Sequence, residues 1–325
     1  MKKQVLFLFS LILMIAPFLS GCTESEKQSS ESGDEFVIYT TVYPLQYFAQ
    51  QIGDEYVRVE TIYPPGVDEH TYEPSQKDII DMAEGDMFLY IGYDLEGFAE
   101  KAKPILEDEG VKTVAVGEAI QLEEQPQTDG TEEHEDEHAH EDEHGDGHHH
   151  IIDPHLWVDP VYSKEMAKVI LDQLVEEMPD KEEVFTKNYE QLAEKLDQLN
   201  DQLTQLATEA KVKEFIVSHA AYGYWEKRYG LKQLSIAGIS SAQEPSQKQL
   251  EEIIDLVHDY NLEYILVEQN ISNKLVDVVK REAGVEALSI HNLSVLTEND
   301  IEENRDYFSI MEDNIETLKQ ALKAE

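Results

Sequence analysis

Histidine is the residue type in this sequence that points most clearly to chemistry. The chain of 325 residues contains 12 histidines, and neutral imidazole is a common ligand for zinc and other transition metals. Seven of the histidines fall within residues 128–150, and the other five are isolated. Because the two groups have different contexts, they predict two different kinds of metal binding.

Three of the isolated histidines lie in loops rich in proline or glycine, namely His70, His155 and His219. Three neutral imidazoles and one oxygen donor make a tetrahedral zinc site. For any one of the three, filling the core or capping a helix is the alternative role, and their wide separation in sequence does not show that they meet. Taken together, the three loops nevertheless predict one shared metal site. His258 falls in a predicted helix, where we expect it to be exposed.

The clustered histidines belong to the low-complexity segment 128–150, which also carries ten acidic residues. Its largest apolar residue is Ala139, so it cannot bury a core and is expected to be an exposed, mobile loop. A solvated charge run is the alternative, but interleaved imidazoles favour weak, multi-site metal binding. The residues expected to gather metal are His134, His138, His140, His144, His148, His149 and His150.

The overall charge narrows the range of partners. The chain has 69 acidic residues against 25 lysines and arginines, which gives a formal net charge of -44. A polyanion of this kind excludes nucleic-acid binding through a general basic footprint, and also flat adsorption to anionic lipid. The acidic excess fits solubility and a cationic partner.

The N-terminus predicts a lipid anchor. A basic start is followed by the apolar run Val5–Leu19 and then by Leu19-Ser20-Gly21-Cys22, which looks like a bacterial lipobox around the only cysteine. We expect a signal peptide at 1–21, a lipid on Cys22 and a flexible tether at 22–35. An ordinary signal peptide, or a core helix with an incidental cysteine, is the alternative. The body of the protein would then sit at the extracytoplasmic face of the cell membrane.

The remaining sequence alternates strand-like and helix-like segments, which predicts two α/β lobes with mainly parallel sheets, in the manner of Rossmann folds. The boundaries are 36–179 for the first lobe, 180–210 for one long linker helix and 211–325 for the second lobe. Apolar residues recur at steps of four and three from Phe185 to Leu206. A coiled-coil dimer is the alternative use of that stripe, but a lone helix between two lobes favours a rigid link and a monomer. His70 and His219 follow predicted strands, where parallel sheets bind ligands.

Four motifs carry a resemblance to a known family. They are P-x-G-x-x-x-H-x-Y-E-P at Pro64–Pro74, D-P-H-x-W at Asp153–Trp157, S-H-x-A-x-G-Y at Ser218–Tyr224 and G-[IL]-S-x-x-x-E-P-S at Gly238–Ser246. From Cys22 onward the sequence resembles the bacterial solute-binding lipoproteins of zinc-uptake ABC transporters, the ZnuA/AdcA group of the metal-binding cluster A-I family. The resemblance implies a metal in the cleft between two lobes joined by one long helix, with His70 and His155 from the first lobe and His219 from the second. It also suggests a Gram-positive cell.

The fourth ligand departs from the family pattern. Many relatives have an acidic residue where this chain has Ser294, and serine is a poor zinc ligand. Three replacements stay open, in this order: Glu69, which directly precedes His70, then a water, then His291.

The resemblance implies a binding protein that captures extracellular Zn²⁺ and hands it to an ABC permease driven by an ATPase, and not an enzyme. A zinc-dependent hydrolase is the alternative from another class, since three histidines and a nearby glutamate also suit metal-assisted hydrolysis. A manganese-specific binding protein and a surface adhesin are further candidate functions. Three histidines favour zinc over manganese, which prefers carboxylates.

Overall fold

The computed structural model describes residues 35–122, 152–270 and 274–324. The predicted signal peptide, Cys22, all of the tether except its last residue, and the histidine-rich loop 128–150 lie outside these described residues. No helix in the described ranges is long and apolar enough to cross a membrane.

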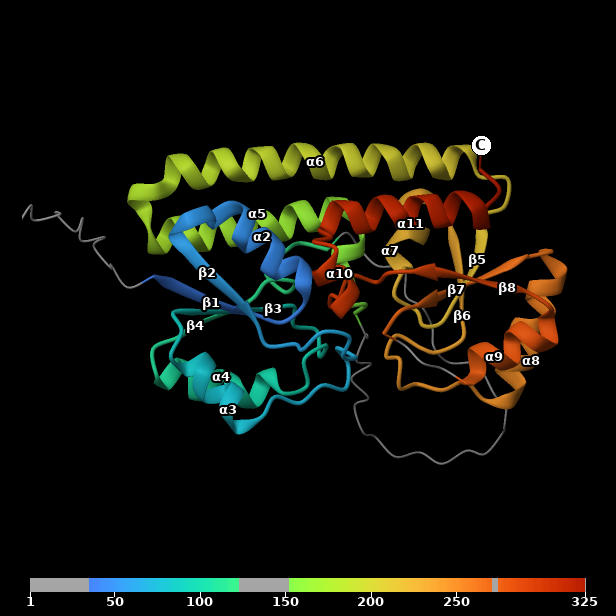
Figure 1. Cartoon of the computed structure of the whole chain (residues 1–325), viewed down its shortest axis with the longest axis horizontal. Coiled ribbons are helices and arrows are strands. Elements are labelled where there is room, and N and C mark those ends of the chain that lie inside the picture. Colours follow the sequence, from blue (N-terminus) through green and yellow to red (C-terminus); the bar gives the residue numbers. More distant parts are fainter. Residues whose placement is uncertain (1–34, 123–151, 271–273, 325) are drawn as a thin grey trace, which may run out of the picture. The chain divides into compact units, whose positions relative to one another are not determined.

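The first lobe is a parallel sheet with helices on both faces (Figure 1). Its strands run in the order β2-β1-β3-β4, and every pairing is parallel. All four residues of β3 are buried, as expected for a strand covered on both sides. The strands are β1 (Phe36–Thr40), β2 (Val57–Thr61), β3 (Met87–Tyr90) and β4 (Lys112–Ala115). Helices α3 (Gln76–Ala83) and α4 (Ala99–Asp108) cover one face, and α2 (Tyr43–Gly53) and α5 (Pro160–Glu177) the other.

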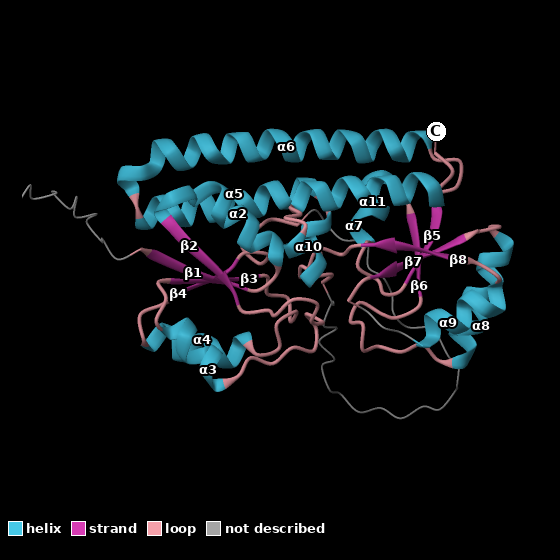
Figure 2. Cartoon of the chain, in the orientation of Figure 1, coloured by secondary structure: helices cyan, strands magenta, loops and turns pink. Residues whose placement is uncertain are grey.

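The second lobe repeats this plan with the order β6-β5-β7-β8, again all parallel. The same five residues, Glu-Pro-Ser-Gln-Lys, occur at 73–77 and 244–248, and the serine of each forms a capping box that starts α3 or its counterpart α8. The strands are β5 (Glu214–Val217), β6 (Lys232–Ser235), β7 (Tyr264–Glu268) and β8 (Glu286–Ile290). Helices α8 (Gln247–Asp259) and α9 (Lys274–Ala283) cover one face, and α7 (Gly223–Tyr229) and α11 (Tyr307–Ala321) the other (Figure 2).

One long helix, α6 (Glu182–Glu209), runs along both lobes (Figure 1). It packs on α2 and α5 of the first lobe and on α7 and α11 of the second. Its apolar stripe from Phe185 to Leu206 is buried within the chain itself. That burial favours the linker interpretation over a coiled coil, and the predicted fold of two α/β lobes with one long helix is confirmed.

Two helices near the C-terminus were not predicted from the sequence. The short α10 (Glu298–Glu302) follows the loop after β8, and α11 packs against α6 and β8. Helix α4 begins at Ala99, after a loop that follows β3. Three short 3-10 turns complete the described chain: η2 (Asp54–Tyr56), η3 (Leu156–Val158) and η4 (Pro179–Lys181).

Two hydrophobic cores differ in extent. The main core is continuous from the first lobe through α5, α6 and α11 to the near face of the second sheet. A smaller core lies between that sheet and the α8–α9 pair, and includes Ile216, Val257, Ile265 and Val279. Helix α6 is therefore part of the core that unites the lobes, while α8 and α9 are attached by fewer buried side chains.

A buried carboxylate organises the loops at the carboxyl ends of β1 and β3. Glu96, only 3% exposed, accepts hydrogen bonds from Thr41 Oγ1 at 2.7 Å, from the Ile91 amide at 2.8 Å and from the Gly92 amide at 3.0 Å. Burial raises the pKa of Glu96 to about 7, although these donors act in the opposite direction. These bonds hold the loop between β3 and α4 in place.

We predict that Leu196→Ala lowers the free energy of unfolding by about 2–5 kcal/mol, because Leu196 is fully buried in the core that unites both lobes. Val184→Ala on the same helix is the matched control. Val184 is 36% exposed, so its truncation should change stability by no more than about 0.5 kcal/mol. Urea unfolding measures both. Equal effects of the two substitutions would contradict this role of α6.

We also predict a pH effect at Glu96. In the folded protein, the Glu96 carboxyl keeps its proton up to a pH of about 7. In an unfolded chain, a glutamate carboxyl loses its proton near pH 4.3. The contribution of Glu96 to the free energy of unfolding therefore falls as the pH rises through this window. Glu96→Gln should flatten the pH dependence between about pH 4.5 and 7, and Glu118→Gln, at an exposed carboxyl, should not. Unchanged slopes in both variants would count against a raised pKa at Glu96.

Candidate metal centre

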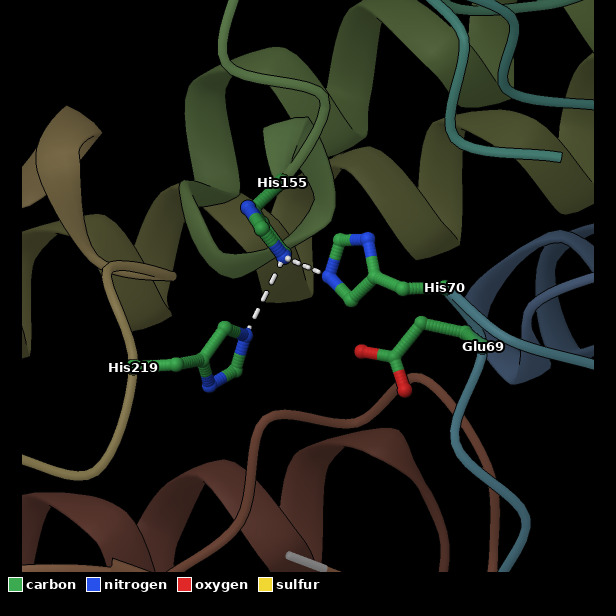
Figure 3. A group of neighbouring side chains, drawn as sticks. All are labelled: Glu69, His70, His155 and His219. Atoms are coloured by element: carbon green, nitrogen blue, oxygen red, sulfur yellow. Dashed lines mark hydrogen bonds between the residues drawn. The ribbon is translucent and has the colours of Figure 1, made fainter. Parts of the chain in front are cut away.

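The structure brings four side chains together from three separate loops (Figure 3). Glu69 and His70 lie on the loop after β2, His155 lies immediately before η3, and His219 follows β5 by two residues. Each offers one ligand atom, and these atoms all lie within 4.8 Å of one another. Glu69, His155 and His219 are buried, and His70 is half-buried. Within the described ranges, this is the only group of three or more histidine, cysteine or acidic side chains with that geometry.

The three imidazoles direct the same ring atom at a common point. His70 Nε2 lies 3.2 Å from His155 Nε2, and His219 Nε2 lies 3.3 Å from the same atom (Figure 3). Two nitrogens bound to a tetrahedral zinc at 2.0–2.1 Å lie roughly 3.3–3.4 Å apart. The spacing of the rings therefore matches the spacing that tetrahedral coordination requires.

His155 is oriented by Asp153, two residues earlier in the same motif. Asp153 Oδ1 lies 2.7 Å from His155 Nδ1 and also accepts a hydrogen bond from the His155 backbone amide at 3.0 Å. A proton held on Nδ1 leaves the lone pair on Nε2, which is the atom that faces the other two histidines. Trp157, fully buried, anchors the segment, and its Nε1 donates to the Asn292 carbonyl at 2.6 Å.

A glycine of the second lobe makes room for this arrangement. A Cβ atom on Gly223 would lie 2.8 Å from Asp153 Oδ2, closer than side chains approach one another. Tyr224, the next residue, donates its hydroxyl to the Asp153 carbonyl. The motif that contains His219 thus also positions the motif that contains His155, across the boundary between the lobes.

His219 has an acidic partner that was not predicted from the sequence. Glu268, at the end of β7, places Oε2 2.6 Å from His219 Nδ1, and both side chains are fully buried. The distance between these two atoms is that of an ion pair. The Nδ1–H bond of His219 does not point at the Glu268 carboxylate, so the contact is not a hydrogen bond. Ser218 Oγ donates to the other oxygen of Glu268 at 3.0 Å. The sequence contained one signal for Glu268. It is an acidic residue at the carboxyl end of a strand, where parallel sheets bind ligands, and His219 has the same position after its own strand.

The electrostatics of the cluster favour a positive charge. Burial lowers the pKa of His70 to about 2, and the neighbouring histidines act in the same direction, so this ring is neutral. Burial also lowers the pKa of His219, but Glu268 outweighs it and raises that pKa to about 9. Burial raises the pKa of Glu69. Two buried carboxylates thus stand beside three imidazoles, an environment that attracts a cation.

Of the side chains proposed for the fourth ligand, Glu69 lies in the group and His291 does not. The Nε2 atom of His291 lies 3.2 Å from Asp300 Oδ2, and its Nδ1 accepts a hydrogen bond from the Leu293 amide at 2.9 Å. Both nitrogens of that ring are therefore engaged elsewhere. Ser294 is buried and bonds to Asn292. A water as the fourth ligand stays a prediction. His258 is exposed on α8, as expected.

Residues 38–321 match the family described as zinc-uptake complex component A, periplasmic. The chain is 34% identical over 316 residues to the high-affinity zinc uptake system protein ZnuA of Bacillus subtilis strain 168, covering 96% of this chain and 97% of that protein. It is 35% identical over 326 residues to the zinc-binding lipoprotein AdcA of Streptococcus pneumoniae strain R6. That alignment covers all of this chain but only 62% of the relative, so the chain spans less than two thirds of that protein's length.

A solved structure agrees with these relatives. The Zn(II)-bound ZnuA-like domain of Streptococcus pneumoniae AdcA superposes with a TM-score of 0.71 at 32% identity, covering 89% of this chain and 99% of that domain. The family match spans nearly all of the described residues, including the four clustered side chains and every strand except the first two residues of β1. The chain therefore belongs to the family of zinc-uptake complex component A proteins.

Proposed function

We propose that this protein is an extracytoplasmic zinc-binding protein that holds one Zn²⁺ between its lobes and delivers it to an ABC permease driven by an ATPase. The observation that carries the proposal is the convergence of three Nε2 atoms, with His155 Nε2 at 3.2 and 3.3 Å from the other two, and one carboxylate within 4.8 Å of them. His70, His155, His219 and Glu69 are the proposed ligands. The relatives named for zinc binding and zinc uptake support this function.

The ligand set favours binding over catalysis. A zinc held for binding alone, like a structural zinc, can be closed by four protein ligands, whereas a catalytic zinc keeps one position open for water or substrate. With Glu69 as a ligand, the four side chains fill a tetrahedral sphere. Three imidazole nitrogens also favour zinc over manganese, whose sites are richer in carboxylate oxygen. These two features argue against the zinc hydrolase and the manganese carrier.

The release of the metal would require the two lobes to separate locally. Several hydrogen bonds join the loop that carries Glu69 and His70 to the second lobe. Among them, Ser241 Oγ donates to Asp68 Oδ2, and Asn270 Nδ2 donates to the Val67 carbonyl at 3.2 Å. Helix α6 packs on both lobes and limits a wide hinge motion. Modest movements that break these contacts would suffice to expose the ion.

The setting of the protein is part of the same proposal. A lipid on Cys22 would hold the binding protein near its permease at the outer face of the membrane, as the lipobox-like sequence suggests. The histidines of residues 128–150 would gather zinc weakly. A monomer is the proposed state, because the apolar stripe of α6 is already buried within one chain.

The first test is the loss of the tight site. His155→Ala should weaken zinc binding by more than about 100-fold, because removing even a hydrogen-bonding partner of a metal ligand costs about 10–100-fold. His258→Ala is the matched control, since that histidine is exposed on α8 and should leave the affinity unchanged. Competition of the protein with a zinc chelator measures both. Retention of the tight site in His155→Ala would rule out the proposed cleft site.

The second test separates the two kinds of binding. Deleting residues 128–150 should remove the weak zinc sites and leave the tight one, because none of the four proposed ligands lies in the deleted segment. Isothermal titration of the full-length and shortened proteins counts the two classes of site. If the deletion abolished the tight site, the metal would have to be held by the loop and not by the cleft.

A further inference from the structure

The proposed oxygen ligand is held from the opposite lobe. Glu69 belongs to the first lobe and is only 2% exposed. Its Oε1 accepts a hydrogen bond from Asn292 Nδ2 at 3.1 Å, and its Oε2 accepts one from Asn270 Nδ2 at 3.4 Å. Both amides belong to loops of the second lobe, after β8 and β7 respectively. The direction of this carboxylate is therefore set by residues more than 200 positions away in the sequence.

The orientation of the Asn292 amide is fixed from its other end. The Ser294 backbone amide donates to Asn292 Oδ1 at 3.1 Å, and Ser294 Oγ bonds to the same oxygen at 2.9 Å. Because a backbone N–H can only donate, it must face the oxygen of the side-chain amide, and the NH₂ group must point the other way. Asn292 is 2% exposed, so water does not compete for these bonds.

The two protons of that NH₂ group meet two buried carboxylates. Asn292 Nδ2 donates to Glu69 Oε1 and also to Glu268 Oε2 at 3.2 Å. Glu268 is the acidic partner of His219. The Asn292 amide thus connects Glu69, the proposed oxygen ligand from the first lobe, with Glu268 of the second lobe. An aspartate in its place would put a third negative charge against these two and remove both donors.

We infer that Asn292 is a positioning residue that presents the Glu69 carboxylate to the metal and fixes it relative to His219. This inference rests on the proposed function, since it requires Glu69 to be a ligand. Partners of this kind fix the direction of a metal ligand, and removing one typically weakens metal binding about 10–100-fold. Asn270, with its longer bond to Glu69, contributes less.

A double-mutant cycle tests the inference. Zinc affinity is measured by chelator competition for the wild-type protein, Asn292→Ala, Glu69→Ala and the double variant. Asn292→Ala alone should weaken binding about 10–100-fold. In the Glu69→Ala background the same change should cost less than about threefold, because a residue that acts through Glu69 has nothing left to position. Equal losses in both backgrounds, or no loss in either, would overturn the inference.

A second asparagine provides the matched control for a structural effect. Asn314 is 3% exposed and makes two hydrogen bonds to the backbone of His291, next to Asn292. Asn314→Ala should lower the melting temperature of the metal-free protein but change zinc affinity less than about threefold. A loss as large as that of Asn292→Ala would mean that loop packing, and not the amide, sets the affinity. If Asn292→Ala does not fold, Asn292→Ser carries the same cycle.

The outcomes separate the inference from the function on which it rests. A wild-type protein without a tight zinc site would refute the proposed function. A wild-type protein that binds zinc tightly, together with an Asn292→Ala variant of the same affinity, would refute only the role of Asn292.

Discussion

The meeting of three imidazole Nε2 atoms in a buried site is the constraint on which the rest of the structure depends. His155 Nε2 lies within 3.3 Å of both other ring nitrogens. A proton or a metal ion at its centre stabilises such a cluster of lone pairs, and partners on the outer side of the rings hold it in place. Asp153 and Glu268 supply these partners for His155 and His219. This arrangement is consistent with the proposed cation site.

The fold serves this constraint by bringing loops from both lobes to one place. The two sheets share a strand order, and the site draws on loops at the carboxyl ends of β2, β5, β7 and β8. Helix α6 packs on both lobes and so holds the two sheets in place relative to one another. Around the site, the contacts that cross the boundary include polar ones: Asp68 with Ser241, and Glu69 with two asparagine amides. Polar contacts of this kind can be exchanged for water at modest cost, which is consistent with the proposed release of the ion.

The sequence predicted the parts of this arrangement that have local signals. The apolar repeat from Phe185 to Leu206 indicated α6, and loops rich in proline or glycine indicated the three histidines. Helix α11 has a similar repeat, from Tyr307 to Leu318, from which it could have been predicted. The roles of Glu268 and Asn292 had no local signal of this strength. Each depends on a side chain from a distant part of the chain, and Asn292 lies 223 positions from the carboxylate that it contacts. Such pairs are set by tertiary packing and not by sequence pattern.

X-ray absorption at the zinc edge tests the proposed ligand set most directly. The sample is the protein without residues 128–150, loaded with one equivalent of Zn²⁺, so that only the cleft contributes to the spectrum. We predict a four-coordinate ion with three imidazole nitrogens and one oxygen, at about 2.0–2.1 Å. A six-coordinate shell rich in oxygen, or fewer than three imidazoles, would contradict the proposed site.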